Sequence, residues 1–348
     1  MASMKFGILG SGSWGTALAK ILTDKGNHIS WWNRSDAAIE QFRSKHHNPQ
    51  YLSSARFDMS KLALSSDPAR VVSDADIVLI AIPSAFVTEA LNRIDGKLLA
   101  SKKIISAVKG ILPEQNILLN DYLKIKYGFD IQNYFTVLGP CHAEEVAAEK
   151  LSYLTFTGLD QAFASEIASH FKTDFINTIV NRDIYGVQYA AVLKNIYAVG
   201  AGIAHGLDYG DNFLSVLIAN SADEMAGFLR KAGIMNAEVG YIDHSPSGRE
   251  VAHHNYAASV YLGDLLVTCY SLFSRNRTFG TMIGKGYSVQ AAKLEMSMVA
   301  EGYMASKCMH IINEKIGAEM PVARTVFDIL WGGKTAGAAF HELEQMLV

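Results

Sequence analysis

The sequence contains little cysteine, and this scarcity narrows the class of protein. Its 348 residues include three cysteines, Cys141, Cys269 and Cys308, which lie far apart along the chain. Their spacing matches neither a disulfide framework nor a zinc-binding pattern, which is typical of proteins from a reducing compartment. We therefore expect a cytoplasmic protein.

The sequence also lacks a membrane-spanning run, a signal peptide and a strong net charge. No uninterrupted apolar stretch reaches spanning length, and the start MASMKFGILG contains no signal-peptide core. The formal net charge of −3 gives no basic field for nucleic acid, so an anionic ligand would need a local site. With 49% hydrophobic and 19% charged residues, the composition is typical of a globular chain long enough for two domains.

The first half of the chain alternates β-rich segments with helical patterns, and the second half is helical. Near-continuous apolar strands separated by helices predict a parallel sheet covered on both faces. The pattern predicts an α/β fold with a doubly wound, mostly parallel sheet over residues 1–186, followed by an all-α domain over residues 187–348. Strands are expected at 5–10, 28–33, 76–83, 102–108, 134–139 and 152–158, and long helices at 189–206, 212–233, 257–273 and 298–317.

A glycine-rich loop follows the first predicted strand and opens the first predicted helix. The segment GILGSGSWGTALA places Gly10, Gly12 and Gly15 in a G-x-G-x-x-G pattern. The first glycine permits a tight turn, the second lets a pyrophosphate approach the backbone, and the third allows close helix packing. In this context the motif predicts a Rossmann-like dinucleotide-binding domain. Ser13 and Trp14 could border the cofactor, although Trp14 could instead only pack the helix.

The end of the second predicted strand bears on the choice of cofactor. A site dedicated to NAD usually has an acidic residue there, which binds the ribose 2′-hydroxyl. Here the segment WWNRSD offers Asn33 and Arg34, and an arginine suits a 2′-phosphate. We therefore favour NADP(H), with NAD(H) as the alternative. The alternative is that Arg34 is a solvated surface charge, and the nearby Asp36 complicates the choice.

Three later predicted strands end in residues that suit a ligand site. One strand ends at Pro83, and Lys109 lies at the end of the next. Gly139 lies at the end of a third, before a helix that starts near Ala143. Ligands of open parallel sheets bind beyond the carboxyl ends of the strands, so these residues should share a rim with the glycine loop. Lys109 could meet an anionic substrate there, or it could be an ordinary surface lysine.

The helical half contains one lysine in an apolar segment. Lys194 is the only formally charged residue between Asp183 and Asp208. A buried ammonium is costly unless it is paired, so Lys194 either reaches solvent or takes part in chemistry. Asp264 and Thr268, four residues apart in GDLLVTC, should share one helical face. Asp264 has apolar neighbours and would need a partner.

A second cluster in the helical half suits phosphate. The segment SRNRTFG gathers Ser274, Arg275, Asn276 and Arg277 at a predicted helix end. Arginine beside small polar donors is suited to phosphate, although such clusters also simply end helices. Glu301 in VAEGY would by default be an exposed helix carboxylate.

The polar segment DHSPSGREVAHHN, residues 243–255, is predicted to be a loop. Its histidines His244, His253 and His254 fit no common zinc signature, so a solvated loop is the preferred interpretation. We predict no metal site in this chain.

The segments GSGSWGTALA, SAVKG, GPCHAEEV, AAVLKNIYAVGAGI, GDLLVTC, SRNRTFG and AEGY together resemble the bacterial-type NAD(P)-dependent glycerol-3-phosphate dehydrogenases. The resemblance runs along nearly the whole chain in the motif order of the family. The chain departs from the family pattern at Cys141, where Ser or Thr is common, and over residues 231–258.

The resemblance also implies roles for individual residues. Lys194 would be the active-site lysine, and we expect Asp264 to be its catalytic carboxylate partner. Substrate would contact Lys109, Gly139, Lys194, Asp264, Thr268, Ser274, Arg275 and Asn276. The cofactor would contact Gly10, Gly12, Ser13, Trp14, Gly15, Arg34, Lys109, Ala143, Arg275 and Glu301.

The implied reaction is reversible hydride transfer between NAD(P)H and dihydroxyacetone phosphate, giving sn-glycerol 3-phosphate for phospholipid synthesis. Lys194 would protonate the C2 alkoxide. Burial lowers the pKa of a lysine and a nearby carboxylate raises it, so a buried, paired lysine can both give and take a proton. The family also implies a homodimer. Two alternatives stay open: another two-domain dehydrogenase, such as one acting on ketopantoate, hydroxyacyl-CoA or 6-phosphogluconate, and a catalytically silent NAD(P)H-binding regulator.

Overall fold

The computed structural model describes residues 4–234, 259–296 and 300–348. The chain divides into two compact units, residues 1–184 and residues 185–348, which are described separately below. The predicted loop 243–255 and its three histidines lie outside the described residues. None of the helices within the described ranges is both long and apolar enough to cross a membrane.

The first unit is built on an eight-stranded sheet with the order β3-β2-β1-β4-β5-β6-β7-β8. All neighbouring strands run parallel except β6 and β7, which are antiparallel. The chain reverses its direction of progress through the sheet between β1 and β4, which is where open α/β sheets bind ligands. The strands are β1 Phe6–Leu9, β2 Ile29–Trp32, β3 Leu62–Ser65, β4 Ile77–Ile80, β5 Lys103–Ser106, β6 Tyr134–Leu138, β7 Ser152–Gly158 and β8 Ile176–Asn181.

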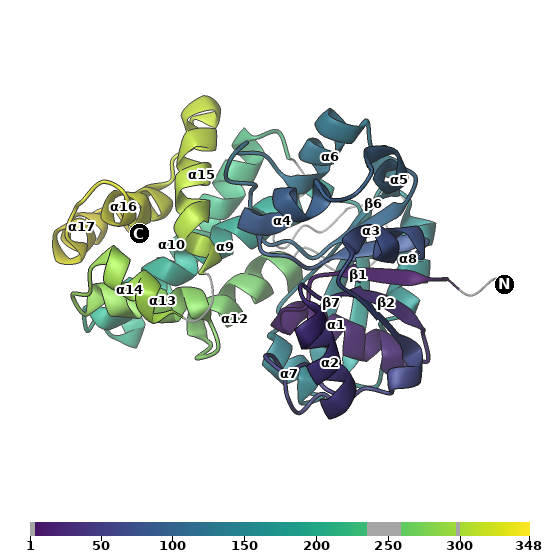
Figure 1. Ribbon diagram of the computed structural model, residues 1–348. Coiled ribbons are helices and arrows are strands. Elements are labelled where there is room, and N and C mark those ends of the chain that lie inside the picture. The colour runs from purple at the N-terminus through teal and green to yellow at the C-terminus, as the bar shows by residue number, and fades with distance from the viewer. Residues whose placement is uncertain (1–3, 235–258, 297–299) are drawn as a thin grey trace, which may run out of the picture. The chain divides into compact units, whose positions relative to one another are not determined.

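Helices cover both faces of the central strands, as the apolar runs of the sequence require. Alternate side chains of a strand point to opposite faces of the sheet, and helices cover both faces here. Every residue of β1 and of β4 is therefore buried. One hydrophobic cluster lies under α1, α2, α7 and α8, and a second lies under α3, α4, α5 and α6 (Figure 1). These helices are α1 Ser13–Asp24, α2 Asp36–Lys45, α3 Pro68–Ser73, α4 Ser84–Leu91, α5 Gly96–Ala100, α6 Leu119–Tyr127, α7 Ala143–Ala147 and α8 Gln161–Ser169.

The doubly wound, mostly parallel sheet and the helical second half confirm the predicted fold class. Two strands were not predicted, β3 and β8, and both lie at edges of the sheet. Their residues are mostly half-buried, so their sequences lack the continuous apolar run that marks the central strands. The short turns η1 Met59–Lys61 and η2 Ile131–Asn133 precede β3 and β6.

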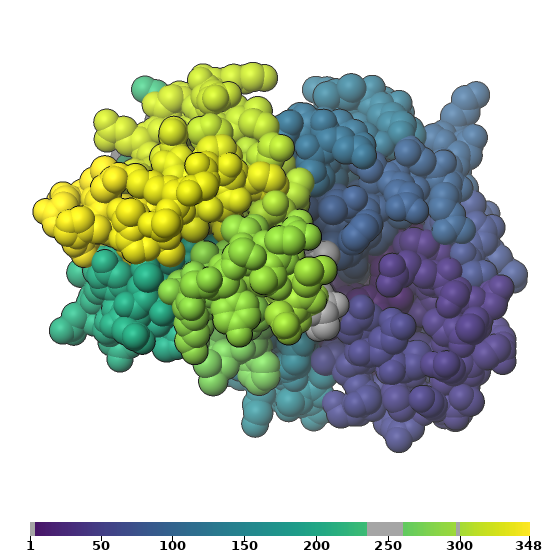
Figure 2. Space-filling view, turned by 60° about the vertical axis from the view of Figure 1, so that its left-hand side comes forward, coloured from purple at the N-terminus to yellow at the C-terminus, as the bar shows by residue number. Residues whose placement is uncertain are grey.

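The second unit is helical throughout the part that the structure describes. Its C-terminal helices α16 and α17 lie together on the surface drawn in yellow in Figure 2. A π-helical turn, η3 Ser259–Gly263, leads directly into α12. The helices are α9 Ile184–Gly206, α10 Asp211–Lys231, α12 Asp264–Tyr270, α13 Arg275–Gly284, α14 Val289–Glu295, α15 Glu301–Ile316, α16 Pro321–Leu330 and α17 Ala336–Leu343.

Helices α9 and α13 meet with their backbones in contact. A Cβ atom added at Gly202 of α9 would lie 2.0 Å from the carbonyl oxygen of Arg277. A Cβ added at Gly280 of α13 would lie 2.0 Å from the carbonyl oxygen of Val199. Only glycine fits at both positions, so the crossing fixes the distance between these two helices.

Candidate active site

The three glycines of the loop after β1 occupy the positions that dinucleotide binding requires. Gly10 has a φ of 118°, and a Cβ there would lie 2.3 Å from the Ala81 carbonyl oxygen. A Cβ at Gly15 would lie 2.3 Å from the Gly10 carbonyl oxygen, so this glycine lets α1 pack closely on β1. At Gly12 a Cβ would meet no atom within 4 Å. The loop therefore leaves open space beside Gly12, where a pyrophosphate could reach the backbone.

Trp14 and Lys109 lie together beside this loop, as the shared rim predicts. The Lys109 amine lies 5.1 Å from the centre of the Trp14 ring, within the range of a cation–π contact. The indole Nε1 of Trp14 is buried and has no hydrogen-bond partner among the described residues. A buried donor without a partner is costly, so this N–H is suited to a ligand acceptor. Ser13 begins α1 and is buried.

The carboxyl end of β2 presents an arginine to solvent. Arg34 is exposed and has no hydrogen-bond or ion-pair partner within the described ranges. Its neighbour Ser35 caps α2 by accepting a hydrogen bond from the Ala38 N–H. Asn33 is buried, and its backbone N–H donates to Ser65 on β3. The Arg34 guanidinium is therefore available to an anion at the position of the cofactor ribose.

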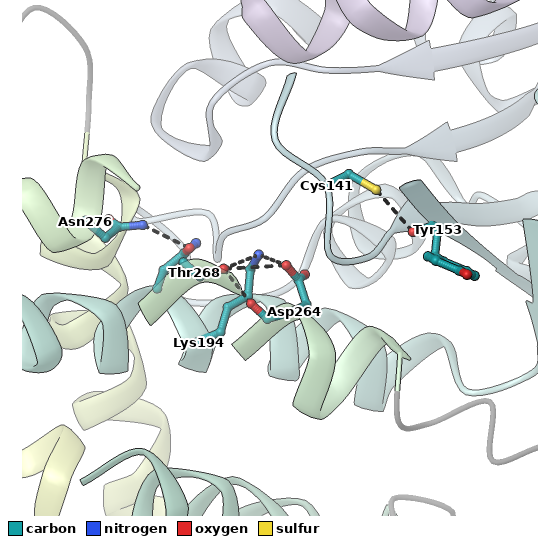
Figure 3. Close-up of polar contacts among 7 residues, drawn as sticks. Cys141, Tyr153, Lys194, Asp264, Thr268 and Asn276 are labelled. Carbon is teal, nitrogen blue, oxygen red and sulfur yellow. Dashed lines mark hydrogen bonds and ion pairs between the residues drawn. The ribbon is translucent and has the colours of Figure 1, made fainter. Parts of the chain in front are cut away.

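The carboxyl end of β6 is shaped by Gly139. This residue has a φ of 138°, and a Cβ there would lie 2.5 Å from the Tyr153 carbonyl oxygen. The Cys141 thiol donates to the same carbonyl at 3.1 Å (Figure 3). Cys141 therefore binds the backbone of β7, and α7 begins two residues later at Ala143, as predicted.

In the second unit, Lys194 is buried and paired. Its side chain is 4% exposed, and its Nζ forms an ion pair with Asp264 Oδ1. The same amine donates to Thr268 Oγ1 at 3.1 Å (Figure 3). The Thr268 hydroxyl in turn donates to the Asp264 backbone carbonyl at 2.6 Å. Helix α9 thus carries the lysine, while one face of α12 carries its two oxygen partners.

One carboxylate oxygen in this group is left without a partner. Asp264 is fully buried, and its Oδ2 has no hydrogen-bond partner within the described part of the chain. Leaving a buried acceptor unsatisfied is costly, more so when it is charged. Asp264 Oδ2 is therefore suited to accept a hydrogen bond from a ligand hydroxyl.

The adjacent cysteine does not take part in this chemistry as a nucleophile. Burial raises the pKa of Cys269 to about 12, and the nearby positive charges of Lys194 and Arg277 offset only part of the effect. Because the thiolate is the reactive form, the protonated thiol is inert at neutral pH. The buried amine and carboxylate are the groups of this cluster that are suited to proton transfer.

The segment SRNR lies at the start of a helix, not at a helix end. Ser274 is the N-cap of α13, and its hydroxyl accepts from the Arg277 N–H at 3.3 Å. Arg275 is the first helical residue and is partly exposed. Backbone N–H groups at a helix N-terminus favour anions, which adds to the charge of Arg275. Arg275 and this first turn are therefore suited to bind a phosphate.

Asn276 connects the first turn of α13 to α9, which carries Lys194, and to the start of α15. Its Nδ2 donates to Asn195 Oδ1 at 2.9 Å, and its Oδ1 accepts from the Gly302 N–H at 2.9 Å. The second N–H of the amide has no partner among the described residues and is suited to a phosphate oxygen. Asn195 follows Lys194 on α9, and Gly302 follows Glu301 at the start of α15, so both helices hold Asn276 in place.

Sequence reasoning missed Asn195 as part of this arrangement. Its proximity to Lys194 in the segment LKN is the signal that could have identified it. No group of three His, Cys, Asp or Glu side chains in the described ranges is placed to hold a metal ion.

Both halves of the chain match models of the same protein family. The model for the N-terminus of NAD-dependent glycerol-3-phosphate dehydrogenase matches residues 5–164, and the C-terminus model matches residues 183–341. A curated glycerol-3-phosphate dehydrogenase (NAD(P)+) from Bacillus subtilis is 32% identical over 340 residues. The alignment covers 97% of this chain and 93% of the relative.

Solved structures show the same similarity. The crystal structure of glycerol-3-phosphate dehydrogenase from Coxiella burnetii matches with a TM-score of 0.85 and 27% identity, and 98% of each chain is covered. A ketopantoate reductase from Ralstonia eutropha matches with a TM-score of 0.57 and 14% identity, covering 98% of this chain and 100% of that one. The second likeness shows a shared fold alone.

Proposed function

The chain belongs to the NAD-dependent glycerol-3-phosphate dehydrogenase family, and from this premise we propose that it reversibly reduces dihydroxyacetone phosphate to sn-glycerol 3-phosphate. The observation that supports this most directly is the buried Lys194–Asp264 pair, with Thr268 on the lysine and an open acceptor on the aspartate. Reduction of a carbonyl needs a proton donor, and the buried Lys194 ammonium would serve as one.

The first unit would hold the cofactor. The open space at Gly12, the unpartnered indole N–H of Trp14 and the exposed Arg34 all fit a dinucleotide. When bound, NAD(P)H supplies the hydride. Relatives in the family use NAD(P)+, and Arg34 at the end of β2 supports a preference for NADP(H) through its 2′-phosphate. Ser13, Lys109 and Ala143 would complete the cofactor contacts of this unit.

Lys194 would protonate the substrate. The C2 carbonyl oxygen becomes an alkoxide on reduction and takes a proton from the Lys194 ammonium; in the oxidative direction the neutral amine takes it back. Asp264 stabilises the buried ammonium, and Thr268 fixes the direction of the amine. Asp264 Oδ2 would accept from a substrate hydroxyl. A positioned proton donor of this kind contributes about 10²- to 10⁴-fold in rate.

The first turn of α13 would bind the phosphate of the substrate. Arg275 supplies the charge, and Ser274 and the remaining N–H of Asn276 supply polar contacts. Binding energy from this remote phosphate would orient the reacting carbon and so favour turnover.

We further propose that the protein is cytoplasmic and forms a homodimer. All three cysteines are free and buried, which suits a reducing compartment. Four apolar side chains from α12 and the segment after it are exposed and would suit an interface. They are Leu266, Tyr270, Leu272 and Phe273. The cytoplasmic product would supply phospholipid synthesis.

The first test is turnover of purified protein with dihydroxyacetone phosphate, followed by the absorbance of NADPH or NADH. Lys194→Ala should abolish turnover while the cofactor still binds, since the lysine acts on substrate. Lys231→Ala, an exposed lysine at the end of α10, is the matched control and should keep full activity. Full activity of Lys194→Ala would refute the catalytic assignment. Wild-type protein that binds NADPH without turnover would support the regulator alternative instead.

A further inference from the structure

The side chain of Asn48 makes four hydrogen bonds, two of which reach the glycine loop and the first turn of α1, although the residue belongs to the polar segment after α2. It is 3% exposed. Its Nδ2 donates to the Ser11 carbonyl oxygen at 2.9 Å and to Thr16 Oγ1 at 2.8 Å. Its Oδ1 accepts from the backbone N–H groups of Gln50 and Tyr51 at 3.0 and 3.2 Å. The amide thus joins its own turn to a loop more than thirty residues earlier.

These partners fix the orientation of the Asn48 amide. The N–H groups of Gln50 and Tyr51 can only donate, and the Ser11 carbonyl can only accept. The side-chain oxygen must therefore face its own turn, and the nitrogen must face the glycine loop. The Thr16 hydroxyl accepts a hydrogen bond from Asn48 and donates one to the Gly12 carbonyl oxygen at 2.8 Å.

The orientation of these carbonyls determines where the loop N–H groups point. In a planar trans peptide the C=O and the following N–H point in opposite directions. Asn48 holds the Ser11 carbonyl, so the Gly12 N–H points away from Asn48. Trp31 Nε1 likewise holds the Gly10 carbonyl at 2.9 Å, so the Ser11 N–H points away from Trp31.

We infer that Asn48 is a positioning residue for the cofactor: it holds the glycine loop so that its backbone N–H groups face the pyrophosphate. This inference rests on the proposed dinucleotide site. Successive backbone N–H groups can together bind an anion, and these two lie next to the N-terminus of α1, which also favours anions. Without the Asn48 donor, the Ser11–Gly12 peptide could rotate, and its carbonyl could then face the phosphates.

The test compares binding of NADPH to Asn48→Ala with binding to the wild-type protein, measured calorimetrically without substrate. Losing two buried hydrogen bonds that organise the loop should raise the Kd for NADPH by at least about tenfold. At saturating cofactor, kcat and the KM for dihydroxyacetone phosphate should stay within about twofold, because the lost interaction serves cofactor binding alone. Asn48→Asp, which keeps the acceptor and loses the donor, should weaken binding as well.

Two controls separate positioning from general loosening of the fold. Asn27→Ala removes a donor to the Leu22 carbonyl at the opposite end of α1, and should leave the Kd unchanged. Thr16→Val breaks the link to Gly12 and should weaken NADPH several-fold, whereas Thr16→Ser keeps the hydroxyl and should restore binding. The Thr16 pair carries the test if the Asn48 variants do not fold.

Wild-type affinity in both Asn48 variants would overturn the inference, and so would an equal loss of affinity in Asn27→Ala. Because NADPH binding is measured without substrate, these outcomes are independent of turnover. An inactive wild-type protein that binds NADPH would refute the proposed reaction and leave the role of Asn48 open to the same measurement.

Discussion

The stability of the helical unit should depend on pH through one buried carboxylate. Glu224 of α10 is 6% exposed, and it accepts the N–H groups of Val322 and Ala323 at 2.7 and 3.0 Å. These are the first free N–H groups of α16, so Glu224 ties α10 to the start of that helix. Burial raises its pKa from the usual 4.5 to about 7, against the opposing effect of the backbone hydrogen bonds from Ala323 and Val322.

The direction in which pH changes the free energy of unfolding follows from the pKa of Glu224 in the folded and unfolded states. The folded-state pKa lies above the unfolded-state value, so with rising pH the unfolded chain loses this proton first. The free energy of unfolding should therefore fall between about pH 4.5 and pH 7.5 and level off above that range. The shift corresponds to about 3 kcal/mol, or roughly 10 °C in the midpoint of thermal unfolding for a unit of this size.

Thermal unfolding of wild-type protein and of Glu224→Gln, followed by circular dichroism from pH 4.5 to pH 8, measures this directly. Other groups titrate in both proteins, so the quantity of interest is the difference between the two profiles. That difference should change by about 3 kcal/mol in favour of Glu224→Gln as the pH rises. A constant difference would refute the reasoning, because it would mean that the pKa of Glu224 is the same in the folded and unfolded states.

Two further predictions concern the ligand contacts. Arg275→Ala should raise the KM for dihydroxyacetone phosphate by about 10- to 100-fold, because it removes a charge-assisted hydrogen bond to the phosphate. The control Arg230→Ala on α10 should leave this KM unchanged. An unchanged KM in Arg275→Ala would remove Arg275 from the phosphate site. Arg34→Ala should raise the KM for NADPH by about tenfold and spare NADH, with Arg43→Ala as control. Equal effects on both cofactors would mean that Arg34 does not bind the 2′-phosphate.

The sequence predicted the features that depend on local pattern. The glycine loop and the buried central strands carry spacing and apolarity that belong to one segment each. Lys194 and Asp264 could be paired because a charge without a local partner in an apolar helix needs a distant one. The apolar and glycine patterns, and the need of a buried charge for a partner, can both be inferred from the residues of the segment itself.

Features that depend on tertiary partners were not predictable in this way. Asn48 precedes a proline in a polar segment, and such an asparagine is typical of any turn. Glu224 looks like one more helix charge until the start of α16 is brought to it. The edge strands β3 and β8 were missed because their half-buried sequences resemble loops. Pairing with a neighbour makes them strands, and the neighbour is distant in sequence.

The glycine contact between α9 and α13 limits how this protein could be redesigned. Lys194 lies on one of these helices, and the phosphate-binding turn proposed for Ser274–Asn276 begins the other. With backbone against backbone at Gly202 and Gly280, no side chain can be trimmed or exchanged to alter their spacing. An engineer seeking room for a bulkier substrate would gain nothing from mutating this crossing. Variation in substrate size would have to come from the surrounding loops.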